Sequence, residues 1–219
     1  MSKHEHHHGH HHGHDHGHDH DHGDHSGSMP VYQFLGNILG FPLDETLLYN
    51  VTDPAFWAER REALENELTH DALDHIEAAV AVLDTIPDES RMMIMQLEFA
   101  RAFLGPDAPM LPVERDYGMP GEQVREAARA MGVDANLQRY LPADHIANEL
   151  FMLVPLDYFN NPSEEQLKTL ADFFMTHTIP LLENMLAHSE GDTDDSGFYR
   201  AIVELTLAWM KWDIAAYEG

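Results

Sequence analysis

The chain has 219 residues, of which 43% are hydrophobic, so it is long enough and apolar enough to bury one real core. It carries 39 acidic and 12 basic residues, and its formal net charge of −27 argues against a partner with a phosphate backbone, so we expect no nucleic acid. The lack of cysteine excludes disulfides, thiolate metal sites and a cysteine nucleophile. The lack of a run of about 18 apolar residues and of an export signal favours a cytoplasmic protein without stable membrane insertion.

Residues 1–28 differ in composition from the rest of the chain, because they consist almost entirely of His, Gly, Asp and Ser. Such a segment cannot bury a core, so we expect a disordered tail. Imidazole and carboxylate groups in a flexible chain bind nickel or zinc, which makes this tail a candidate metal-binding tract. Its irregular pattern favours a native origin, and an expression tag is the alternative. The candidate ligands are His4, His6, His7, His8, His10, His11, His12, His14, His16, His18, His20, His22 and His25.

Residues 29–219 carry a succession of helix signals, beginning with a short lead-in. An apolar face between Pro30 and Pro42 predicts a small docked helix. Asp53 followed by Pro54 predicts the start of the next helix, because aspartate caps helices and proline suits the first turn. Its apolar pattern continues to Leu68. Leu73, Ile76, Val80 and Leu83 then predict a third helix that ends before Pro87, and Asp88 to Leu104 a fourth.

The second half of the chain begins with a segment of repeated proline and glycine at 105–121, which predicts a long loop. Helices are predicted over 122–131, ending at Gly132, and over 144–154. Ser163 caps a further helix that Pro180 kinks or splits, and the apolar positions from Phe198 to Trp212 give the last one. No segment alternates with period two, so we predict a single all-α domain.

The chemistry-bearing residues gather around Asp144. Helical geometry places His145 and Glu149 one turn apart on one face, with Asp144 beside them at the start of the helix. The simpler interpretation is structural: Asp144 caps the helix, and the other two form an exposed pair. A metal-dependent hydrolase built on His145 and Glu149 is a third possibility, but a mononuclear site needs at least one more ligand.

Two other groups of residues are interpreted as structural. Asp71, Asp74 and His75, with His70 nearby, are typical of a solvated helix face. The apolar positions between Met92 and Phe103 are typical of a core, although methionine-rich surfaces also suit adaptable peptide grooves. The sequence has no nucleotide-binding loop or serine-hydrolase motif, so we expect no enzyme.

Residues 141–152, with the sequence LPADHIANELFM, resemble the hallmark of the TorD/DmsD family of redox-enzyme maturation chaperones. Residues 99–106, FARAFLGP, are similar to the family's aromatic and Gly-Pro element, with Ala102 where leucine is usual. A proline-rich loop follows, as in the family, and the resemblance extends from about Leu47 to Trp212. In the segment after that loop only Tyr117 matches.

This resemblance implies an all-helical cytoplasmic chaperone that binds the twin-arginine signal peptide and the apo form of a molybdopterin-containing oxidoreductase subunit. The chaperone holds its client until the cofactor is inserted, acts as a monomer or dimer and requires no cofactor itself. The resemblance assigns peptide binding to Asp144 and His145, and to Phe99, Phe103, Gly105, Pro106 and Tyr117. Chemistry adds Glu149, since paired guanidinium groups need carboxylates. The alternative function is nickel or zinc storage or delivery through the histidine-rich tail.

Overall fold

The computed structural model describes residues 31–134, 137–153, 164–191 and 196–217. Within these ranges the chain is helical and contains no strand, apart from one isolated bridge between Val113 and His145. The predicted all-α class is therefore confirmed. No helix in the described part of the chain is long and apolar enough to cross a membrane. The tail at 1–28, with its thirteen histidines, lies outside the described residues.

The first half of the chain forms five helices with the expected start signals. They are α1 (Val31–Gly40), α2 (Glu45–Val51), α3 (Pro54–Leu64), α4 (His70–Asp84) and α5 (Asp88–Phe103). Asp53 caps α3 as predicted, because its side chain accepts a hydrogen bond from the Ala55 amide. Helix α2 was not predicted. Its start has a clear local signal, since the Asp44 side chain accepts from the Leu47 amide.

The second half contains shorter elements around the proline-rich segment. They are the 3₁₀ helix η1 (Glu114–Tyr117), α6 (Glu122–Ala130), α7 (Ile146–Phe151), α9 (Glu164–Phe173), the π-helical turn η3 (Phe174–Thr178), α10 (Ile179–His188) and α11 (Phe198–Tyr217). Gly132 follows α6 with a φ of 73°, which is the predicted stop. Pro180 is the second residue of α10, directly after the π-helical turn η3. The break predicted at Pro180 is therefore this π-helical turn, which separates α9 from α10.

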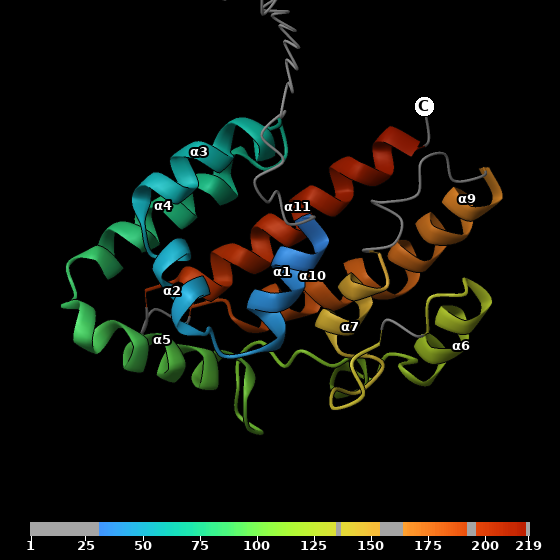
Figure 1. Cartoon of the computed structure of the whole chain (residues 1–219). Coiled ribbons are helices and arrows are strands. Elements are labelled where there is room, and N and C mark those ends of the chain that lie inside the picture. Colours follow the sequence, from blue (N-terminus) through green and yellow to red (C-terminus); the bar gives the residue numbers. More distant parts are fainter. Residues whose placement is uncertain (1–30, 135–136, 154–163, 192–195, 218–219) are drawn as a thin grey trace, which may run out of the picture.

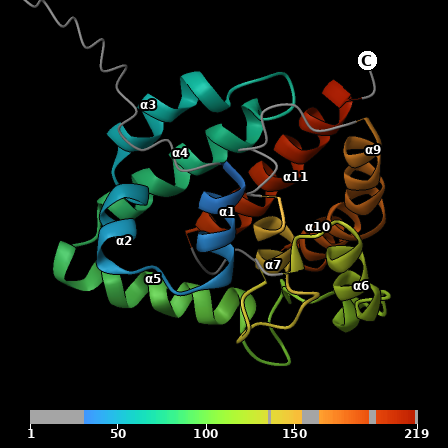
Figure 2. The same cartoon turned by 45° about the vertical axis from the view of Figure 1, so that its right-hand side comes forward.

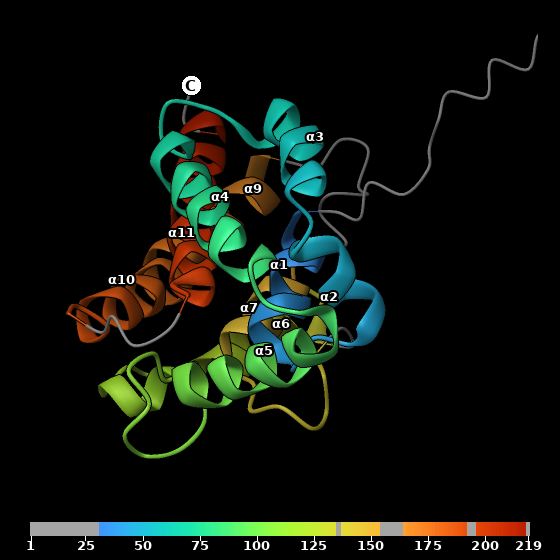
Figure 3. The ribbon, with the colours of Figure 1, turned by 90° about the vertical axis from the view of Figure 1, so that its left-hand side faces the viewer.

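Helix α1 lies in the middle of the molecule. Figures 1 and 2 show α3, α4 and α5 on one side of it and α6 and α9 on the other, with α11 crossing behind. Figure 3 shows α3 and α4 at the top of the molecule and α5 at the bottom, with α1 between them. The most extensive contacts join α1 to α7, α4 to α11, and α10 to α11.

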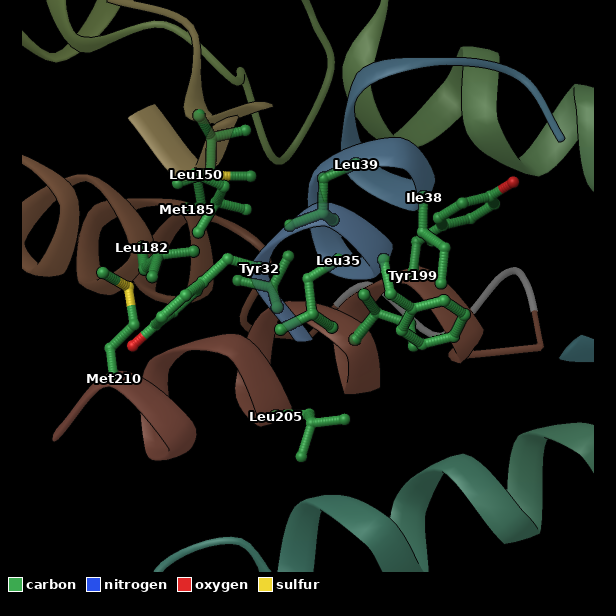
Figure 4. Close-up of a cluster of buried hydrophobic side chains, with 14 of the residues drawn as sticks. Tyr32, Leu35, Ile38, Leu39, Leu150, Leu182, Met185, Tyr199, Leu205 and Met210 are labelled. Atoms are coloured by element: carbon green, nitrogen blue, oxygen red, sulfur yellow. The ribbon is translucent and has the colours of Figure 1, made fainter. Parts of the chain in front are cut away.

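One core joins the two halves of the chain. Figure 4 shows side chains of α1, α7, α10 and α11 meeting in a single cluster, among them Leu35, Leu39, Leu150, Leu182, Met185 and Met210. All six are almost fully buried. Burial of one such side chain stabilises the fold by about 1.5–3 kcal/mol relative to leaving it exposed. The Tyr32 hydroxyl of α1 also donates to the Asp213 carboxylate of α11.

Two glycines let α1 approach α7 closely. A Cβ atom at Gly40 would lie 2.7 Å from the Cβ of Ala147, and one at Gly36 would lie 2.8 Å from the Phe151 ring. Real Cβ atoms do not come this near to their neighbours, so the packing requires glycine. Since α7 carries Glu149 and begins directly after Asp144 and His145, this close contact fixes their position relative to the core.

Some predicted core positions are exposed. Leu68 lies beyond the end of α3 and Leu97 lies on the outer face of α5, and these side chains are 46% and 61% exposed. Met93 is exposed on the same helix, and Trp212 is 37% exposed near the end of α11. The apolar spacing correctly predicted the buried faces of these helices. The exposed positions are single apolar residues, which are common on protein surfaces.

Candidate functional site

The site is built where the segment before α7 meets the proline-rich segment. The Ile146 amide donates to the Pro112 carbonyl at 2.8 Å, and the Glu114 amide donates to the Asp144 carbonyl at 3.1 Å. These bonds flank the isolated bridge between Val113 and His145. The predicted long loop at 105–121 is thus tied down here, and it contains the 3₁₀ helix η1. The helix predicted over 144–154 is shorter in the structure, where α7 spans only 146–151.

His145, and not Asp144, caps α7. The Nδ1 atom of His145 accepts a hydrogen bond from the Ala147 amide at 3.1 Å, which corrects the structural interpretation of Asp144. The ring is buried, and this burial lowers the pKa of His145 to about 4, although the Asp144 charge acts in the opposite direction. The imidazole is therefore neutral near pH 7, and its Nδ1 is an acceptor.

Asn148 holds the chain that leads into α7. Its side-chain oxygen accepts from the Gln138 amide at 2.6 Å, and its Nδ2 lies 2.7 Å from the Pro142 carbonyl, to which it donates. The same amide also donates to the carbonyls of Gln138 and Leu141. One buried side chain thus shapes residues 138–142. The twelve-residue segment 141–152 is a single structural unit as a result.

Asp144 is the acidic group at the edge of this unit. Its side chain is 7% exposed and lies 3.5 Å from the Arg115 guanidinium, whose own side chain is 60% exposed. The Arg115 amide also donates to the Asp144 carboxylate, at 3.4 Å. Gly121 packs against the carboxyl group, and a Cβ atom there would lie 2.8 Å from Cβ and Cγ of Asp144. The carboxylate therefore already holds one guanidinium group from its own chain.

Glu149 is fully buried, which corrects the expectation of an exposed pair with His145. Neither of its carboxyl oxygens has a hydrogen-bond partner among the described residues. Desolvation raises the pKa of Glu149 well above its ordinary value, and the charges of Glu114 and Asp144 raise it further. The Thr178 hydroxyl lies close enough to lower this pKa slightly, without a well-directed bond to Glu149. Burial without a partner therefore favours the neutral acid form of Glu149.

The structure adds Glu114 and His177, which the sequence analysis missed. Oε1 of Glu114 lies 2.8 Å from Nδ1 of His177, and both side chains are buried. Oε2 of Glu114 has no partner within the described chain. The signal for His177 was its position one turn after Phe173 on an apolar face, where a polar side chain needs a buried partner. Glu114 had no comparable signal, because it lies in the proline-rich segment.

The predicted aromatic part of the site lies in the core. Phe99 and Phe103 are 3% and 2% exposed and pack edge to face against each other and against Tyr199 of α11. They cannot form an open apolar groove in this arrangement, which corrects the expectation that they line one. Gly105 and Pro106 follow α5 in an exposed turn, and Gly105 has a φ of 101° that only glycine adopts easily.

Tyr117 is half-buried at the end of η1. Its ring lies 5.0 Å from that of His188 in α10, measured between centroids, and partial burial raises the pKa of Tyr117 to about 12. Its hydroxyl lies close enough to the Leu111 backbone to lower this pKa slightly, without a well-directed hydrogen bond. The structure therefore brings Asp144, His145 and Glu149 together, and places Tyr117 on the segment that covers them.

No metal site is seen in the described residues. They contain no group of three or more His, Asp or Glu side chains arranged to hold an ion. His145 uses its Nδ1 as a helix cap, and burial disfavours the charged form of Glu149, so this pair gives the hydrolase alternative no support. The acidic cluster on α4 is also occupied, because Arg61 pairs with Glu65, Asp74 and Glu77, and His75 pairs with Glu204. The interpretation of that cluster as a solvated face agrees with these exposed ion pairs.

Comparison with known proteins finds no family model that matches this chain and no solved structure that matches it. Any functional assignment therefore depends on the residues and on the geometry described above.

Proposed function

We propose that residues 29–219 form a chaperone of the TorD/DmsD type. It binds the twin-arginine signal peptide of a molybdopterin-containing oxidoreductase in the cytoplasm and holds this client for cofactor insertion before export. The observation that carries the proposal is the Asp144 carboxylate, which contacts the exposed Arg115 guanidinium. Two further buried carboxyl groups, those of Glu114 and Glu149, lie near it. A site with this composition suits an arginine-rich ligand.

The chemistry of the site supports a guanidinium ligand in particular. Arginine presents a planar fork of donors that pairs with carboxylates, and such charge-assisted bonds are stronger than neutral ones. The Arg115–Asp144 pair supplies an internal example of that contact, because Arg115 reaches Asp144 from an exposed position. Arg115 is exposed and its contact with Asp144, at 3.5 Å, is longer than a strong charge-assisted hydrogen bond. A peptide arginine is therefore able to replace it.

The charge of the whole chain supports the same class of ligand. A net charge of −27 attracts a cationic peptide over long distances and accelerates the encounter. Salt screens this attraction, since the Debye length is about 8 Å at physiological ionic strength. Binding of the peptide should therefore weaken as salt rises.

Calorimetry tests the proposal. The full chain is titrated at two salt concentrations with the twin-arginine leader of the molybdopterin oxidoreductase encoded nearest to it. We expect salt-sensitive binding that weakens at least tenfold in Asp144→Asn, which removes the charge and keeps the shape. Asp107→Asn, an exposed aspartate of the same proline-rich segment, is the matched control and should bind normally. A leader with both arginines changed to lysine should also bind weakly, because lysine lacks the planar fork.

Two results would contradict this function. The first is the absence of any binding to the matched leader, and the second is equal binding by Asp144→Asn and the native chain. The second candidate function, nickel or zinc storage, is favoured by one observation, the thirteen histidines of residues 1–28. The two functions are compatible, because the tail and the Asp144 region are separate in sequence.

A further inference from the structure

The strongest unexplained feature of the molecule is the Glu149 carboxyl group. It is completely buried, and both of its oxygens lack a hydrogen-bond partner in the described residues. Oε2 of Glu114 and the hydroxyl of Thr178 are unpartnered in the same way. Buried polar groups are nearly always paired, so several unpaired atoms on neighbouring elements indicate a ligand group that completes the site.

The groups that face Glu149 do not supply a positive charge. Glu114 acts on it from η1, Asp144 from the segment before α7, and Thr178 from η3. His145 is a neutral acceptor, because its Nδ1 accepts from the Ala147 amide. The other nitrogen-bearing side chains nearby are already engaged: His177 contacts Glu114, and Arg115 contacts Asp144. None of the described residues is seen to pair with an ionised Glu149.

Arg115 makes two long contacts in the segment that covers the site. The Arg115 amide is 3.4 Å from its Asp144 acceptor, and the Arg115 guanidinium lies 3.5 Å from the same carboxylate. These contacts are longer than a strong charge-assisted pair, so a ligand guanidinium competes with Arg115 for Asp144. Asp144 is close enough for its charge to raise the pKa of Glu149, so a ligand bound at Asp144 is also near Glu149.

We propose that Glu149 binds the second guanidinium group of the twin-arginine peptide and releases its own proton when it does so. This inference rests on the proposed function and deepens it. In the free protein Glu149 is a neutral acid. On binding, its O–H bond breaks, the proton passes to the solvent, and the carboxylate pairs with the arginine, while Asp144 pairs with the other arginine. Glu149 thus selects ligands that carry a permanent cation.

Proton release gives the inference a thermodynamic signature. A ligand that binds only the ionised form of a group binds more tightly as pH rises, until the group is ionised in the free protein as well. The affinity for the leader should therefore increase as pH rises above the ordinary pKa of a glutamate, because burial raises the pKa of Glu149. The heat of binding should depend on the buffer, because the buffer takes up the released proton.

The test is calorimetry of the full chain with the same leader in phosphate and in Tris at pH 7, with EDTA present. We expect a net release of protons on binding by the native chain and none by Glu149→Gln. Glu149→Gln should bind at least tenfold more weakly. It should remain folded, because the amide has nearly the shape of the neutral acid. Glu62→Gln, which removes a fully exposed glutamate of α3, is the control and should behave as the native chain does.

The outcomes separate this inference from the proposed function. Binding without proton release by the native chain, or the same release by Glu149→Gln, overturns the role of Glu149 and leaves the chaperone function standing. Absence of binding by the native chain overturns both. The comparison of buffers uses the native chain alone, so the inference stays testable even if Glu149→Gln does not fold.

Discussion

Gly121 lies directly against the side chain of Asp144, at the end of the proline-rich segment. A Cβ atom there would be 2.8 Å from Cβ and Cγ of Asp144, whose side chain is only 7% exposed. The absence of a side chain at Gly121 therefore allows Asp144 to occupy its position beside Arg115. The location of the candidate binding carboxylate depends on a residue 23 positions earlier in the sequence.

We expect Gly121→Ala to displace Asp144. Overpacking of a buried contact costs about 1–3 kcal/mol, and we expect this loss in urea unfolding together with a tenfold or greater loss of leader affinity. Gln123→Ala, an exposed position in the following helix, should change the stability by no more than about 0.5 kcal/mol. Normal leader binding by Gly121→Ala would show that the position of Asp144 is unimportant.

Removal of the internal competitor should strengthen peptide binding. Arg115→Ala frees the Asp144 carboxylate, and because the 3.5 Å contact between the two side chains is long, we expect a two- to fivefold gain in affinity, corresponding to about 0.4–1 kcal/mol. The charge-matched control is Arg139→Ala, another exposed arginine, which should give no such gain beyond the change in net charge. Weaker binding by Arg115→Ala would mean that Arg115 assists the peptide instead.

The stability of the protein should depend on pH through His145 and Glu149 in opposite ways. Burial lowers the pKa of His145 to about 4, so its stabilising contribution is present above the unfolded value near 6.5 and is lost as pH falls toward 4. The pKa of Glu149 is raised, so its contribution is present below the unfolded value near 4.3 and is lost as pH rises. Between about pH 4.3 and 6.5 the two effects oppose each other.

Single variants separate these two effects in urea unfolding measured from pH 4 to 8. His145→Asn keeps a side-chain acceptor for the Ala147 amide and does not titrate, so its stability should fall as pH rises across this range. Glu149→Gln should gain stability as pH rises from 4 to 6.5 and then stay level. Parallel curves for the native chain and Glu149→Gln would contradict a buried neutral acid at this position.

The contact between α1 and α7 predicts unequal effects at two glycines. At Gly40 the added methyl group would meet Cβ of Ala147, which moves only with its helix, so we expect Gly40→Ala to destabilise by about 1–3 kcal/mol. At Gly36 it would meet the Phe151 ring, which has rotational freedom, and alanine gains about 0.5–1 kcal/mol inside a helix. Gly36→Ala should therefore be milder. Equal losses in urea unfolding would refute this account of the packing.

Deletion of residues 1–28 separates the two candidate functions. The deletion removes thirteen of the eighteen histidines, so we expect loss of nickel and zinc binding, measured by equilibrium dialysis with elemental analysis. Leader binding should be unchanged, apart from a small electrostatic effect, because Asp144 and Glu149 remain. A loss of leader binding would place the peptide site in the tail. Retained metal at one ion per chain would reveal a site in the body.

Much of the helical framework was predictable from local chemistry. The starts at Asp53 and Pro54 and the stop at Gly132 follow from capping and from backbone freedom, which involve only neighbouring residues. Helix α2 was missed because only seven residues form it and its apolar face is short. The spacing of Asp144, His145 and Glu149 also showed that they would lie close together.

The sequence by itself determined the all-α class, the acidic character and the grouping of these three residues. Only the tertiary structure decided that Glu149 is buried and unpaired, that His145 is the cap, and that Glu114 and His177 complete the group. Helical periodicity fixes which residues share a face, but whether that face meets solvent depends on what packs against it. Here η1 and η3, distant in sequence from α7, cover that face, and their contribution is a property of the folded chain alone.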